Sequence, residues 1–191
     1  PINEKGTLGT PVSIDLGGNL TAAAADTFDP AKGFTGLVAA TGAEGSASLV
    51  IFDGTGDVTA TKGRTVAIAH PADSLILRSP DGLTPDKDLF ILGGGSLSRL
   101  PAIGKAGSGI ENIDLPFTAV DFAAGEFIRD RRARTELAVL ADNGSIYYLA
   151  NGSLDRRPFT EDEMRAAFAK DGRGRTVIVN STDTASALAN N

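Results

Sequence analysis

The sequence contains no cysteine and no tryptophan, and it has one histidine and one methionine. Without cysteine the chain has no disulfides, no thiolate catalysis and no zinc–thiolate site. The lone His70 lies in neither an HExxH spacing nor a triad with a Gly-x-Ser-x-Gly elbow. We therefore expect His70 at a loop corner and not in a metal or catalytic site.

Clustered positive charge and long apolar runs are also scarce. The net charge is -6 and the one basic run is "RDRRAR" at 129–134, which we interpret as a solvated loop that pairs with Glu126, Asp130 and Glu136. The alternative is a basic loop that docks an acidic partner or is a protease-processing site. Nucleic acids and anionic membranes bind clustered Lys and Arg, so we expect neither as a partner. No apolar run approaches the roughly 20 residues of a membrane helix, so we expect no membrane insertion.

Glycine is abundant, with 23 residues, and it punctuates apolar runs as in a β-protein. The stretch "TELAVLADNGSIYYLANGSL" at 135–154 predicts a hairpin, because two runs of β-formers flank an Asn-Gly pair. Asn143-Gly144 predicts a type I′ turn, in which both residues take a positive φ. The near-continuous apolar runs predict strands buried on both faces.

The order of lead-in, strand, turn and strand recurs along the chain. It is found at 31–52, 85–100, 134–149 and 172–188. The spacing of about 40 to 50 residues between the copies is typical of propeller blades. The alternative is an all-β protein with spaced hairpins, folded as a β-sandwich or a β-solenoid.

Some of these copies resemble a known repeat family. "GEFIRDRRARTELAVL" (125–140) is similar to a blade of the FG-GAP, or VCBS, type of β-propeller. In 10–42 the motif positions are taken by Asp26, Phe28, Asp29 and Gly33, and weaker copies lie at 79–95 and 170–179. The resemblance implies four-stranded antiparallel blades arranged radially, about seven in most members.

The expected fold is therefore all-β, a propeller-like array of about four antiparallel blades in a single domain, 1–191. The approximate blades are 10–60, 61–105, 106–155 and 156–191. Four blades are fewer than the family's usual ring. We therefore expect another segment of the same precursor, or a second copy, to complete the propeller.

The family also implies a possible cofactor, because its loops bind Ca²⁺ through several carboxylate oxygens. Asp81, Asp86 and Asp88 in "DGLTPDKD" are the best-preserved candidate ligands. The alternative is a set of polar turns in which Asp accepts local backbone hydrogen bonds.

One segment departs from the repeat pattern. Thr160 and Glu163 in "TEDEM" form a capping box, and apolar residues follow at helical spacing. We expect a short helix near 161–170, where the fourth blade should have its first strand.

The expected function is an extracellular binding or structural module that mediates protein or carbohydrate interaction, cell adhesion or assembly. The family resemblance supports this as analogy. The chain starts at Pro1 without a signal peptide, so we expect a processed piece of a secreted or cell-surface precursor. No catalytic constellation is visible, and we expect no enzyme. The alternative is a polysaccharide hydrolase or lyase that uses a carboxylate pair.

Overall fold

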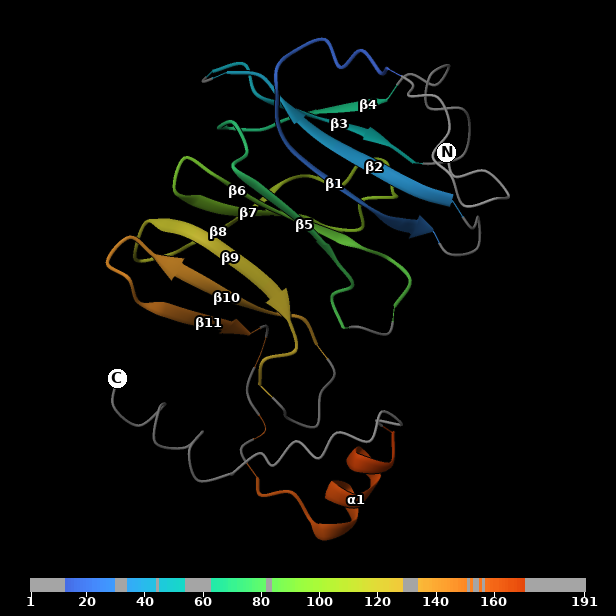
Figure 1. Cartoon of the computed structure of the whole chain (residues 1–191), viewed down its shortest axis with the longest axis vertical. Coiled ribbons are helices and arrows are strands. Elements are labelled where there is room, and N and C mark those ends of the chain that lie inside the picture. The colour runs from blue at the N-terminus through green and yellow to red at the C-terminus, as the bar shows by residue number, and fades with distance from the viewer. Residues whose placement is uncertain are drawn as a thin grey trace. The chain divides into compact units, whose positions relative to one another are not determined.

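A computed structural model describes residues 13–29, 34–43, 45–53, 63–81, 84–128, 134–150, 152, 155 and 157–170. The chain divides into two compact units, Pro1–Asp155 and Arg156–Asn191. The described residues of the first unit form three antiparallel sheets, and those of the second form one helix (Figure 1). The expected all-β class is confirmed at this level. The predicted repeat at 172–188 lies outside the described residues.

The first two sheets have four strands each, and each strand pairs with the next one along the chain. The first sheet consists of β1 (Leu20–Asp29), β2 (Phe34–Thr41), β3 (Ser48–Phe52) and β4 (Arg64–Ala67). The second consists of β5 (Ser74–Arg78), β6 (Asp88–Gly93), β7 (Ser96–Leu100) and β8 (Glu111–Ile113). Both sheets are simple antiparallel meanders.

The third sheet has three strands. It consists of β9 (Ala119–Gly125), β10 (Glu136–Ala141) and β11 (Ile146–Ala150), with β10 in the middle. The first strands of successive sheets lie next to each other, β1 beside β5 and β5 beside β9. The outer edges of the three sheets are therefore β4, β8 and β11.

A first apolar cluster joins the first and second sheets. Its buried members are Phe28, Val38, Ala40, Leu49 and Ile51 from the first sheet, and Ala72, Leu75, Leu89, Ile91, Leu100 and Ile103 from the second sheet and its loops. Two polar contacts cross the same boundary. Arg64 donates to the Ile103 carbonyl at 2.8 Å, and Lys87 pairs with Asp26 at 3.2 Å.

A second apolar cluster joins the second and third sheets. Its buried members are Phe90, Leu92 and Leu97 from the second sheet and Ala119, Phe122, Leu137 and Val139 from the third. Strand β6 supplies both clusters, because successive side chains of a strand point to opposite faces. All six of its residues are buried, so the middle sheet has a packed layer on each side.

The β10–β11 hairpin is confirmed, but the type I′ prediction for its turn is wrong. Gly144 has a φ of +82°, whereas Asn143 is not in the positive-φ region. The Gly144 N–H donates to the Ala141 carbonyl, and the Ala141 N–H donates to the Ser145 carbonyl. This is a three-residue loop with a glycine bulge, which needs a positive φ at the glycine alone.

The expectation of strands buried on both faces is confirmed for β6 and is wrong for β11. Ile146 is 60% exposed and Tyr148 is 55% exposed. Their faces would be covered only by a layer beyond the third sheet. An apolar run indicates that a strand is suited to burial, but it does not determine whether another layer covers that strand.

The helix of the second unit is confirmed as α1 (Glu161–Lys170). Its capping box is present: the Thr160 N–H donates to Glu163 Oε2 at 2.8 Å, and the Glu163 N–H donates to Thr160 Oγ1 at 3.3 Å. These reciprocal bonds satisfy two donors at the helix start. The three acidic residues in the first turn interact favourably with the positive end of the helix dipole.

Candidate functional site

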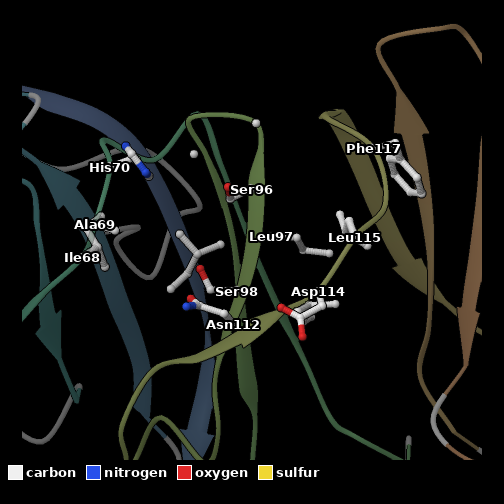
Figure 2. Close-up of a pocket in the computed structure, with 14 residues that line it drawn as sticks. Ile68, Ala69, His70, Ser96, Leu97, Ser98, Asn112, Asp114, Leu115 and Phe117 are labelled. Carbon is white, nitrogen blue, oxygen red and sulfur yellow. The ribbon is translucent and has the colours of Figure 1, made fainter.

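A cavity of about 330 Å³ lies in the first unit at one end of the middle sheet. Three stretches of chain form it: the β4–β5 connection, the β6–β7 hairpin, and β8 with the loop that follows it. Figure 2 shows the side chains that line it. Its polar side chains are His70, Ser96, Ser98, Asn112 and Asp114.

The polar side chains are placed by strand register. Ser98 on β7 is the direct partner of Asn112 on β8, so the two side chains share one face of the sheet. Figure 2 shows Ser98 beside Asn112. Asp114 follows two residues later, just beyond the strand. A hydroxyl, an amide and a carboxylate therefore lie along one short stretch of the cavity wall.

The apolar part of the cavity gives it a rigid wall. Ile68, Ile91, Leu97 and Leu115 line it, and Ile91 and Leu97 belong to the two core clusters. Phe117, which also lines the cavity, stacks on Tyr147 with ring centroids 4.1 Å apart. Apolar walls with a few placed polar groups are typical of ligand sites.

The glycine run at 93–95 brings the hairpin close to its neighbours. A Cβ on Gly94 would lie 2.7 Å from the ring of His70, and one on Gly95 would lie 2.5 Å from Thr118 Cγ2. Both glycines also have a positive φ, +57° and +74°. The run is a β-turn, and its lack of side chains lets His70 pack against it.

His70 lies in the connection between β4 and β5, at a loop corner as expected. It lines the cavity, which sequence reasoning did not foresee. Ser96, Ser98, Asn112 and Asp114 were also missed as site residues. Polar residues in a strand normally face solvent, so their sequence pattern alone carries no sign of a shared cavity.

A second cavity of about 320 Å³ lies between the middle and third sheets, and an ion-pair network lines it. Asp88 is only 3% exposed. Its carboxylate accepts hydrogen bonds from Arg99 Nε at 2.8 Å and from the Ala102 N–H at 2.9 Å. The same guanidinium reaches Glu111 at 3.3 Å. Two carboxylates thus lie on either side of one arginine.

The three predicted calcium ligands have separate partners. Asp81 Oδ1 accepts the Thr84 N–H at 2.7 Å and the Thr84 hydroxyl at 2.9 Å, an Asx-type turn. Asp86 pairs with Lys105 at 2.6 Å, and Asp88 is held by Arg99. Among the described residues no group of three or more acidic or histidine side chains is placed to hold a metal ion. The calcium site stays a prediction, and it requires Asp86 and Asp88 to leave their cations.

A third polar cluster lies in the third sheet, where Arg134 pairs with Glu136 as expected. The expectation that the basic run is solvated is wrong for Arg134, which is buried. Glu136 is completely buried, and its Oε2 accepts the N–H groups of Phe127 and Ile128. Its other oxygen lies 3.6 Å from Arg134 Nε. These bonds tie the chain after β9 to the start of β10, so the cluster is structural. Of the basic run at 129–134, only Arg134 lies within the described residues.

Compared with family models and with curated proteins, the chain matches none of them. No helix in the described part of the chain is long and apolar enough to cross a membrane.

Proposed function

We propose that the chain is a non-catalytic binding module, extracellular or at the cell surface, built on a β-propeller-like scaffold. Three features support the scaffold: successive meander sheets, first strands that lie side by side, and a middle sheet buried on both faces. Radially packed blades have these features. In this proposal another protein segment or another copy completes the ring.

The ligand we propose for the cavity is a carbohydrate. The supporting observation is the row of Ser98, Asn112 and Asp114 beside the apolar side chains Ile68 and Ile91. Sugar hydroxyls donate and accept hydrogen bonds, and hydroxyl, amide and carboxylate groups offer both functions at fixed positions. The apolar side chains Ile68 and Ile91, on the same face of the sheet as Ser98, then contact the C–H faces of the ring. A cavity of this size suits one or two sugar residues.

The test is an NMR titration of the purified chain with glucose, galactose, mannose and N-acetylglucosamine in separate experiments. We expect at least one sugar to shift the amide signals of Ser98, Asn112 and Asp114 in a saturable way. Asn112→Ala should weaken that binding by about tenfold, which is the loss of one or two neutral hydrogen bonds. Asn143→Ala, an exposed loop change in the same unit, should leave it unchanged.

Two results would reject the carbohydrate proposal. One is the absence of saturable shifts with all four sugars. The other is a sugar whose affinity is the same for the Asn112→Ala variant and the unmodified chain.

The alternative function, a polysaccharide hydrolase or lyase, is favoured by one observation. Asp88 and Glu111 both line the second cavity, and a glycosidase needs two placed carboxylates. However, Arg99 forms ion pairs with both of them, so each carboxylate would have to leave this arginine before it could contact a substrate. Release of reducing ends from a polysaccharide, abolished by Glu111→Gln, would favour the enzyme over the binding module.

A further inference from the structure

The outer edge of the third sheet differs from the outer edges of the other two. In the described part of the chain no strand pairs with this side of β11, and its sheet has three strands where the others have four. An unpaired edge presents a row of free backbone N–H and C=O groups. Natural proteins protect such edges by short strands, charged side chains, proline or a covering segment.

The other two outer edges carry this protection. Strand β4 has four residues and includes Arg64, and β8 has three residues and includes Glu111. Strand β11, "IYYLA", has five residues, no charge and no proline. Within one molecule, two edges are blunted and the third is long, neutral and apolar.

The side chains beside this edge are exposed and apolar. By register, Tyr148 on β11 lies opposite Ala138 on β10, which lies opposite Ala123 on β9. Phe127 is 43% exposed and packs at a tilt against Tyr148, with ring centroids 5.8 Å apart. An apolar strip therefore runs across the sheet and ends at the open edge.

The hairpin geometry fixes which backbone groups of β11 point outward. The Ala141 N–H donates to the Ser145 carbonyl, so residue 145 points its carbonyl toward β10. Along an antiparallel strand, the backbone N–H and C=O groups of successive residues point alternately to one side and to the other. Residues 147 and 149 therefore bond to β10, and the N–H and C=O groups of residues 146, 148 and 150 face the open side.

We propose that two copies of this chain join edge to edge through β11, antiparallel, about a twofold axis at Tyr148. In this register Tyr148 lies opposite its own copy and Ile146 lies opposite Ala150. All outward N–H and C=O groups are then paired, because residues 146, 148 and 150 are the ones that face outward. The ladder β9-β10-β11 continues into the second copy without a break.

Charge favours a second copy as the partner of this edge. The chain carries a net charge of -6, so self-association is opposed wherever like charges meet. From 145 to 151 the sequence "SIYYLAN" has no charged residue, so the twofold register places no like charges across the interface. The interface is isologous, which closes at two copies and does not extend into fibres.

Cysteine crosslinking tests this register, because the chain has no cysteine of its own. Opposed residues that bond to each other in an antiparallel ladder have Cα atoms about 5.5 Å apart, within disulfide range. We expect mild oxidation to convert most of the Tyr148→Cys variant to a species of twice the 19.6 kDa chain mass. The matched control is Ile146→Cys, at an equally exposed position. In the dimer its two copies are four residues out of register, more than about 13 Å apart, and should not crosslink.

Light scattering at several concentrations gives an independent readout. The unmodified chain should have the mass of a dimer, and Tyr148→Lys should be monomeric, because two lysines would meet on the axis. Val120→Lys changes a residue that is also 55% exposed, on β9 at the other edge of the sheet, and should remain dimeric. A monomeric unmodified chain, equal crosslinking of both cysteine variants, or a dimer that survives Tyr148→Lys would overturn the proposal.

Discussion

Glu136 shows how one residue controls a local part of the fold. Its carboxylate is completely buried, accepts two backbone N–H groups and lies beside the buried Arg134. A buried ion pair adds little net stability when it is complete, because desolvation opposes the attraction. Removing one partner is costly, since the other charge and the two N–H groups stay buried.

We expect Glu136→Ala to lower the free energy of unfolding by about 3–5 kcal/mol. Glu136→Gln keeps an acceptor for the N–H groups and should cost less. Glu126→Gln, an exposed change ten residues earlier, should stay within about 0.5 kcal/mol of the unmodified chain. Urea denaturation followed by circular dichroism measures all three. Equal midpoints for Glu136→Ala and Glu126→Gln would show that the buried carboxylate is not needed.

The sequence allowed the helix cap of Thr160 and Glu163 and the loop position of His70 to be predicted, because both depend on nearby residues. It did not indicate the burial of Glu136, whose donors lie eight and nine residues earlier in the chain. Nor did it bring Ser98 and Asn112 together, because their contact depends on the register between β7 and β8. A site whose side chains are brought together by strand register cannot be predicted before the pairing of the strands is known.

At the scale of single elements, the loop between β10 and β11 depends on Gly144. Its φ of +82° is unfavourable for a residue with a Cβ, although nothing lies within 4 Å of the position that a Cβ would occupy. The cost of a side chain there is therefore conformational and not steric. Gly109 offers a matched control, because its surroundings are equally open and its φ is ordinary.

We expect Gly144→Ala to lower the free energy of unfolding by about 1–2 kcal/mol, the cost of a left-handed conformation for a residue with a Cβ. Gly109→Ala should be neutral or stabilise by up to about 1 kcal/mol, because it restricts the unfolded chain. Thermal or urea unfolding of both variants measures the difference. If the two variants have the same stability, the loop does not hold Gly144 at a positive φ.

Helix α1 and strand β11 show which properties of a helix or strand can be predicted from its own sequence. The helix was predicted with its bounds because Thr160 and Glu163 form its cap from residues three apart. The hairpin was predicted for the same local reason. The burial of β11 was predicted wrongly, since burial is decided by a neighbouring layer or chain, which no local pattern specifies.

At the scale of the first unit, the middle sheet couples the two outer sheets. Alternate residues of β6 enter the two apolar clusters, Leu89 and Ile91 on one side and Phe90 and Leu92 on the other. Loss of either cluster exposes one face of a strand that is buried on both. Burial of one such side chain is worth about 1.5–3 kcal/mol, so neither outer sheet can be lost without a large effect on the middle one. We therefore expect the three sheets to unfold together.

The two tyrosines make this cooperativity measurable. Tyr147 and Tyr148 both lie on β11, and the chain has no tryptophan, so tyrosine fluorescence reports on the third sheet alone. Leu49 is completely buried in the first cluster, in the sheet that does not contact β11. We expect Leu49→Ala to shift the tyrosine transition in urea by the equivalent of about 2–5 kcal/mol, together with the circular dichroism signal. Leu20→Ala, on the exposed part of the same sheet, should shift neither. A tyrosine transition that stays in place while circular dichroism falls at lower urea would mean that the sheets unfold separately, and that the third sheet is stable without the first.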